Sequence, residues 1–156
     1  MKLRRPSTEP AHESLAPPEN PIDARTPGAR LTLRLPDTVG ASPLARAAVD
    51  VVGFELSDFA RENAQLVVSE LVTNALEHGG GETRLLLEAR GDRRIVGEIV
   101  DEGDGFTPPP MRLPAASAQR GRGLWLVSSL AERWGVKEGT TRVWFQMPAD
   151  PEPSAG

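Results

Sequence analysis

The chain has 156 residues, no cysteine and a formal net charge of −4 at pH 7. Its length predicts a single domain, and the lack of cysteine excludes disulfides and thiolate metal ligands. The acidic balance argues against nucleic acid as the main partner, and the longest apolar runs are too short to cross a bilayer. No apolar stretch follows the basic residues at the N-terminus, so we expect a cytoplasmic protein with no signal peptide and no membrane partner.

The two ends of the chain differ in composition from its middle. Residues 1–29 are rich in Pro, Glu, Ser and Ala and contain few large apolar side chains, and residues 149–156 are similar. Such segments cannot bury enough surface to offset the entropy lost on ordering. We therefore expect two disordered tails around one domain at residues 30–148.

The domain is expected to begin with a strand and a helix. Residues 30–36 alternate Arg and Thr with Leu, which is a strand pattern. A helix is predicted to follow, with Ser42 as its N-cap and Pro43 at its first position. The apolar positions that would share one face of this helix are Leu44, Ala47, Ala48, Val51 and Val52.

A second, longer helix is predicted from residue 57 onward. It would end at Gly79, because glycine commonly follows the last helical turn. Its apolar positions recur at helical spacing. Those expected to point into the core are Leu66, Val67, Leu71 and Leu76.

The next segments predict a hairpin and a long loop. Residues 83–103 contain two apolar runs on either side of a Gly91-Asp92 turn, which is a hairpin signal. Residues 106–120 contain four prolines and little periodicity, so we expect a loop there.

The end of the domain predicts a third amphipathic helix and a final hairpin. The helix is expected from Gly123 until Gly135, and the hairpin at residues 135–148. The order is strand, helix, helix, two strands, loop, helix, two strands. It predicts an α+β protein: a two-layer sandwich with a mixed, mostly antiparallel sheet and helices on one face.

Three polar residues lie at four-residue intervals on the second predicted helix. Glu70, Asn74 and His78 would stack along one edge, beside the apolar face. Glu70 could polarise a hydroxyl or a water, and the side-chain oxygen of Asn74 could hold a hard cation. The alternative is an ordinary solvated helix edge.

A second motif comes at the end of the predicted strand that precedes the loop. Gly103 and Gly105 follow Asp101 at two-residue spacing. The carboxylate could accept a hydrogen bond from a ligand, while the glycines let that ligand approach the backbone. A simple turn after a strand would have the same composition.

A third motif opens the third predicted helix. Gly121 and Gly123 lie where the Pro-rich loop enters it, and Arg122 adds a positive charge. Free N–H groups at a helix start favour an anion such as phosphate. The segment is not a P-loop, because no Lys-Ser or Lys-Thr follows, and not a dinucleotide-binding fingerprint, because no strand precedes it.

In combination these motifs resemble the GHKL ATPase superfamily, whose ATP-binding unit is the Bergerat fold. The likeness lies in an E-x-x-x-N helix, a strand ending in D-x-G-x-G, a Pro-rich loop and G-x-G-L at a helix start, over residues 31–148. The segments VVSELVTNALEHG, GRGLWLVSSLAERWGV and GTTRVWFQMP are similar more narrowly to the anti-sigma-factor serine kinase branch. In that branch such a domain stands alone, most often in actinobacteria.

The resemblance implies a role for each residue of the first two motifs. Glu70 would be the general base, and Asn74 would coordinate Mg²⁺. His78 would lie near the phosphates, or would instead cap the end of its helix. Asp101 would bind the exocyclic amine of adenine.

Further matched positions would line the same pocket. Gly103 and Gly105 would shape the adenine pocket, Thr140 would lie near the adenine, and residues 106–120 would form a short lid. Gly121 and Gly123 would belong to the phosphate-facing segment, with Arg122 and Leu124 beside them.

The same resemblance implies a regulatory kinase. Such a protein binds ATP and Mg²⁺, transfers the γ-phosphate to Ser or Thr of an anti-anti-sigma (STAS-type) partner, and controls sigma factor availability. Members are commonly homodimers, and the first strand and the helix near Ser42 would meet the other chain. Two alternatives stay open: an ATP-gated binding protein without phosphotransfer, and the catalytic domain of a histidine kinase, although the chain shows no helix pair with a phosphoacceptor His.

Overall fold

The computed structural model describes residues 30–52, 56–90, 94–103, 122–137 and 142–148. In chain order its elements are β1 (Arg30–Leu35), α1 (Ala41–Val52), α2 (Asp58–His78), β2 (Thr83–Arg90), β3 (Arg94–Val100), α3 (Arg122–Leu130), β4 (Arg133–Val136) and β5 (Val143–Pro148). The expected tails, the Pro-rich loop and the Gly91-Asp92 turn lie outside the described residues.

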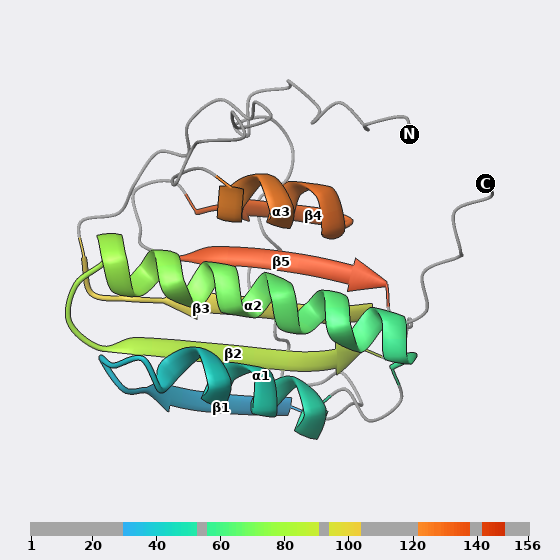
Figure 1. Ribbon diagram of the computed structural model, residues 1–156, viewed down its shortest axis with the longest axis horizontal. Helices are drawn as coiled ribbons and strands as arrows, with labels where there is room; N and C mark the ends of the chain where they lie inside the picture. The colour runs from blue at the N-terminus through green and yellow to red at the C-terminus, as the bar shows by residue number, and fades with distance from the viewer. Residues whose placement is uncertain (1–29, 53–55, 91–93, 104–121, 138–141, 149–156) are drawn as a thin grey trace.

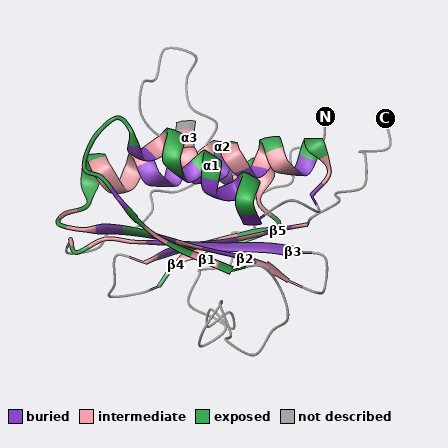
Figure 2. Cartoon of the chain, turned by 90° about the horizontal axis from the view of Figure 1, so that it is seen from below, coloured by how far each residue is buried: buried purple, intermediate pink, exposed green. Residues whose placement is uncertain are grey.

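The described strands form one five-stranded sheet in the order β1-β2-β3-β5-β4, and every neighbouring pair is antiparallel. The described helices all lie on one face of this sheet (Figures 1 and 2). α1 packs on β1 and β2, whereas α2 packs on β3 and β5. The expected α+β two-layer sandwich is confirmed, and its sheet is antiparallel throughout the described strands.

The first helix has a different buried face from the one expected. α1 begins at Ala41, one residue before the expected cap. Leu44, Ala47 and Val51 are exposed, so the predicted face is wrong at these positions. The buried side chains are Ala41, Ala45, Ala48, Val49 and Val52.

Polar contacts with α2 explain this rotation of α1. Arg46 Nη1 donates a hydrogen bond to Ser69 Oγ over 3.2 Å. Gln65 Nε2 on α2 donates to Asp50 Oδ1 over 3.1 Å. Because these bonds turn the polar edge of α1 toward α2, its small side chains face the sheet and its larger apolar ones face outward.

The second helix begins and ends where its sequence signals place it. Ser57 is the N-cap, and its Oγ accepts a hydrogen bond from the Ala60 N–H over 3.1 Å. The helix ends at Gly79, whose N–H donates to the Ala75 carbonyl over 2.8 Å. None of the described helices is both long and apolar enough to span a membrane.

The core face of α2 agrees with the prediction at three of four positions. Val67 and Leu71 are buried, and Leu76 is half-buried against the core. Leu66 is 46% exposed, so its prediction is wrong. It precedes Val67 by one residue, which turns it about 100° away from that neighbour on a helix of 3.6 residues per turn.

The centre of the sheet is packed around a glycine. Gly97 in β3 lies under the buried ring of Phe145 in β5, and the two residues face each other in the strand register. A Cβ added at Gly97 would lie 2.2 Å from the ring and 2.9 Å from Leu87 of β2. The absence of a side chain at Gly97 therefore lets one large aromatic residue fill the core between the sheet and α2.

The third helix is shorter than expected. α3 ends at Leu130 instead of near Gly135, and the chain then enters β4. The Glu132 N–H already donates to the Gln146 carbonyl over 2.9 Å, and Trp134 pairs with Phe145. The helix ends before these residues because, as a strand, they form hydrogen bonds with the backbone groups on the outer edge of β5. The final hairpin is confirmed, but its first strand begins two residues early.

Candidate functional site

The end of α2 and the end of β3 meet at Gly79. Asp101 follows β3 directly, and its carboxylate packs against Gly79: a Cβ added there would lie 2.6 Å from both Cγ and Oδ2 of Asp101. The Gly103 N–H donates to Asp101 Oδ1 over 2.7 Å, which fixes the rotation of the carboxylate. Asp101 is therefore placed beside the last turn of α2, at the same end of the helix as Asn74.

The backbone that follows Asp101 is bonded to the glycines that follow α2. The Glu102 N–H donates to the Gly80 carbonyl over 2.7 Å. Gly81 has φ +66°, in the left-handed region that glycine adopts without steric cost. From the sequence, these glycines are expected only to end the helix. The structure adds that Gly79 and Gly81 allow a close approach that side chains would prevent.

The start of α3 meets α2 at Glu70. A Cβ added at Gly123 would lie 2.4 Å from Glu70 Oε2, so this carboxylate packs directly on the backbone of the third motif. Leu124, one residue further on, is buried in the core. It anchors the helix start to the domain, beside Gly123.

The remaining polar positions of the α2 edge are more open. Asn74 is half-buried. It lies five residues before Gly79, which corresponds to a rise of about 7.5 Å along a helix. The side chain of His78 is 56% exposed, and its Nε2 lies 3.7 Å from Glu77 Oε2. The role of His78, near the phosphates or as a cap of its helix, stays a prediction.

Part of the expected site falls outside the described residues. This applies to Gly105, Gly121, Thr140 and the residues of the lid, and also to the side chain of Arg122. In the described part, Gly123 packs against Glu70 on α2 and Gly79 packs against Asp101, and Asn74 lies between Glu70 and Gly79 along α2.

The described side chains can be compared with the ligands that magnesium prefers. Among the residues that the structure describes, no three His, Cys, Asp or Glu side chains are grouped to hold a metal ion. An amide oxygen at Asn74, with the Glu70 carboxylate one helical turn away in the chain, is a sparse set. It fits Mg²⁺, which usually takes one or two protein ligands and completes its shell with phosphate oxygens and water.

Known structures with this fold include the RsbU and RsbW domains of Rv1364c from Mycobacterium tuberculosis, at a TM-score of 0.54 and 18% sequence identity. That match covers 77% of this chain and 32% of the other, so the chain spans about a third of the length of its structural relative. Comparison with curated proteins gives no match. Residues 35–147 match the family model of the histidine kinase-like ATPase domain, a span that includes α2, the Asp101 turn and α3. This chain is therefore a member of the histidine kinase-like ATPase domain family.

Proposed function

We propose that the protein is an ATP-dependent switch. It would transfer the γ-phosphate of ATP to a Ser or Thr of an anti-anti-sigma partner and thereby control the availability of a sigma factor. One observation carries the proposal: two motifs that are distant in sequence both contact α2 or its end, Asp101 at Gly79 and Gly123 at Glu70.

The carboxylates have distinct roles in this proposal. Asp101 accepts a hydrogen bond from the exocyclic amine of adenine, and Gly103 holds it in the required orientation through Oδ1. Glu70 orients the incoming hydroxyl and takes its proton, because a carboxylate near a phosphate-facing helix start is placed to act as a general base. Such transfer depends mainly on positioning and on stabilising charge.

Magnesium would be held by Asn74 and the phosphates. When bound, it would neutralise charge on the transferred phosphoryl group. The protein side of this arrangement is the half-buried amide of Asn74, one helical turn from Glu70. His78, exposed at the end of the same helix, would lie near the phosphates.

The partner assignment rests on the motif resemblance to anti-sigma-factor serine kinases. A shared fold with a protein that contains an RsbW domain supports it. A serine or threonine acceptor also suits a site with a carboxylate base, because a hydroxyl must lose its proton during transfer.

A homodimer is part of the proposal, and the outer side of α1 supports it. Leu44 and Val51 are 39% and 67% exposed, one above the other on the helix. β1, below them, is an edge strand of the sheet. A second chain that covered this side would bury apolar surface and pair with the outer edge of β1. Val51→Glu should shift a dimer toward monomer in analytical ultracentrifugation, and an unchanged sedimentation coefficient would remove this surface from consideration.

Two substitutions test the kinase proposal. Asp101→Asn should weaken ATP binding by about 10- to 100-fold in calorimetry, because it removes a charge-assisted hydrogen bond. Glu70→Ala should keep ATP affinity but lower transfer by about 10²- to 10⁴-fold. Transfer is measured as labelling of recombinant anti-anti-sigma proteins of the same genome by γ-³²P-ATP.

The same assays separate the kinase from an ATP-gated binding protein. A wild-type chain that binds a fluorescent ATP analogue but labels none of these proteins would contradict the kinase proposal and favour gating. A Glu70→Ala chain with full transfer would place the base elsewhere. Retained ATP affinity in Asp101→Asn would show that the adenine assignment is wrong.

A further inference from the structure

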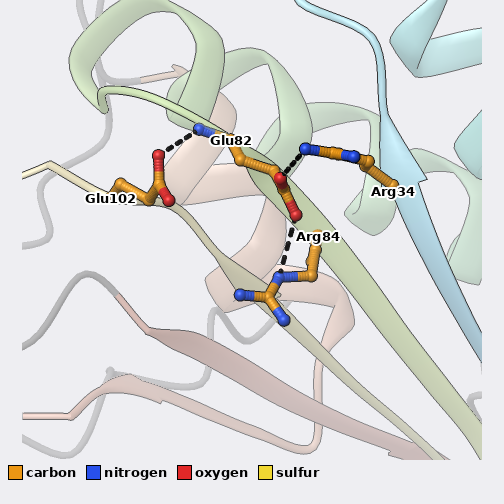
Figure 3. A network of polar contacts seen from close by, with 4 residues as sticks. All are labelled: Arg34, Glu82, Arg84 and Glu102. Carbon is orange, nitrogen blue, oxygen red and sulfur yellow. Dashed lines mark hydrogen bonds and ion pairs between the residues drawn. The ribbon is translucent and has the colours of Figure 1, made fainter.

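A small charged network lies next to the proposed adenine site and is not used by the mechanism above. It consists of Glu102, Glu82, Arg34 and Arg84 (Figure 3). Glu102 immediately follows Asp101, whereas the others come from the start of β2 and from the edge strand β1.

Glu102 closes the gap between β3 and the glycine segment. Its Oε2 accepts a hydrogen bond from the Glu82 N–H over 2.8 Å, and its own N–H donates to the Gly80 carbonyl. The carboxylate also packs over Gly81, where an added Cβ would collide with it. Residues 79–82 are thus held against residues 101–103 by one backbone bond and one side-chain bond.

Two arginines hold Glu82, whose N–H bonds Glu102; we call this pair of acidic residues the clamp. Arg84 Nε lies 3.3 Å from Glu82 Oε1, and Arg34 Nη2 donates to Glu82 Oε2. Arg34 and Arg84 face each other in the register of β1 and β2, so Glu82 also separates two like charges. Because both carboxylate oxygens of Glu82 are engaged, its backbone N–H is held toward Glu102.

We propose that Glu102 is a positioning residue for Asp101, and that it sets the preference of the site for adenine over a base with a carbonyl at the same position. The inference rests on the proposed function, in which Asp101 reads the exocyclic amine. The clamp keeps the Asp101 backbone at a fixed distance from α2, so that the carboxylate meets the amine in line. Without the side-chain bond, the turn can move away from Gly79 and this alignment is lost.

The test compares ATP with inosine triphosphate, which has a carbonyl in place of the amine. The ratio of their dissociation constants isolates the contact with the amine, since a change in net charge or in overall stability affects both nucleotides alike. Glu102→Ala should reduce the preference for ATP by about tenfold, the typical effect of one misaligned charge-assisted hydrogen bond. Glu102→Gln keeps an acceptor for the Glu82 N–H and should retain most of the preference.

Glu132→Ala is the matched control. Glu132 is also a surface carboxylate that holds a sheet segment, but its partner Arg94 lies at the opposite end of β3 from Asp101. This variant should keep the wild-type preference. Thermal unfolding of all three variants checks that each is folded at the temperature of the titration.

The outcomes separate the inference from the proposed function. A Glu102→Ala protein with the wild-type preference for ATP would overturn the positioning role and leave the adenine assignment of Asp101 intact. Loss of preference in Glu102→Gln to the same extent as in Glu102→Ala would also overturn it, because the hydrogen bond would not be the cause. A wild-type chain without any preference for ATP would overturn the proposed function itself.

Discussion

Replacing Gly79 by alanine tests whether the fit between α2 and Asp101 sets nucleotide affinity. The new Cβ would lie 2.6 Å from the carboxylate of Asp101 and 2.4 Å from the Ala75 carbonyl oxygen. Nonbonded heavy atoms normally approach to about 3.5–4.0 Å. The carboxylate must therefore retreat by about 1 Å, or the last turn of α2 must open.

The expected loss follows from this displacement. A shift of about 1 Å removes most of a charge-assisted hydrogen bond, which contributes about 1.5–3 kcal/mol. Since about 1.4 kcal/mol corresponds to a factor of ten, the affinity for ATP should fall by about 10- to 150-fold. The domain should remain folded, because the contact lies at its rim and outside the core.

Gly80→Ala is the control for this experiment. A Cβ at Gly80 would have Gly103 Cα as its nearest neighbour, at 3.4 Å, which is ordinary contact. Calorimetric titration with a non-hydrolysable ATP analogue should therefore separate Gly79→Ala from Gly80→Ala, while thermal unfolding shows both to be folded. Equal affinity of the two variants would refute the reasoning.

Three further predictions concern other contacts. Gly123→Ala should push the Glu70 carboxylate aside and lower transfer by about 10²-fold at nearly unchanged ATP affinity; unchanged transfer would contradict the contact. Gly97→Ala overpacks the core against Phe145 and should lower the free energy of unfolding, measured by urea titration, by about 1–3 kcal/mol. Adding Phe145→Leu should partly restore this stability. An unchanged free energy of unfolding in Gly97→Ala would contradict the packing. Burial raises the pKa of Glu98 above its ordinary value, against a lowering by the neighbouring Arg142 and Lys137. The stabilising contribution of the protonated carboxyl is therefore present at low pH and is lost as pH rises through the raised pKa. Glu98→Gln should gain stability relative to wild type as pH rises above the ordinary carboxyl pKa, and a difference that is constant with pH would exclude this titration.

The sequence was sufficient for the order and type of the elements, because those depend on local periodicity and on end signals. Ser57 and Gly79 mark both ends of α2 in this way. The rotation of α1 was not accessible, since several apolar faces are possible and hydrogen bonds from Arg46 to α2 select one of them. The end of α3 was missed for a similar reason: the strand at Arg133–Val136 is stabilised by β5, which comes later in the chain.

For the candidate site too, local features could be predicted from the sequence and contacts between distant segments could not. The spacing of Glu70 and Asn74 on one helix edge is a local property and could be predicted. The contact of Gly79 with Asp101 joins two segments that are distant in sequence, so only the motif order pointed to it. Glu102 carried no signal at all, because an exposed acidic residue in a turn is common and its bond to the Glu82 N–H requires the folded chain.

The small side chains under α1 have a consequence for local stability. Alanine and valine at positions such as Ala45 and Val49 bury less hydrocarbon than leucine would, at about 0.8 kcal/mol per methylene. The amide hydrogens of α1 should therefore exchange with solvent through a local opening that costs less than global unfolding. A chain bound over Leu44 and Val51 would have to suppress this opening, so slowed exchange in α1 would report occupancy of that surface directly.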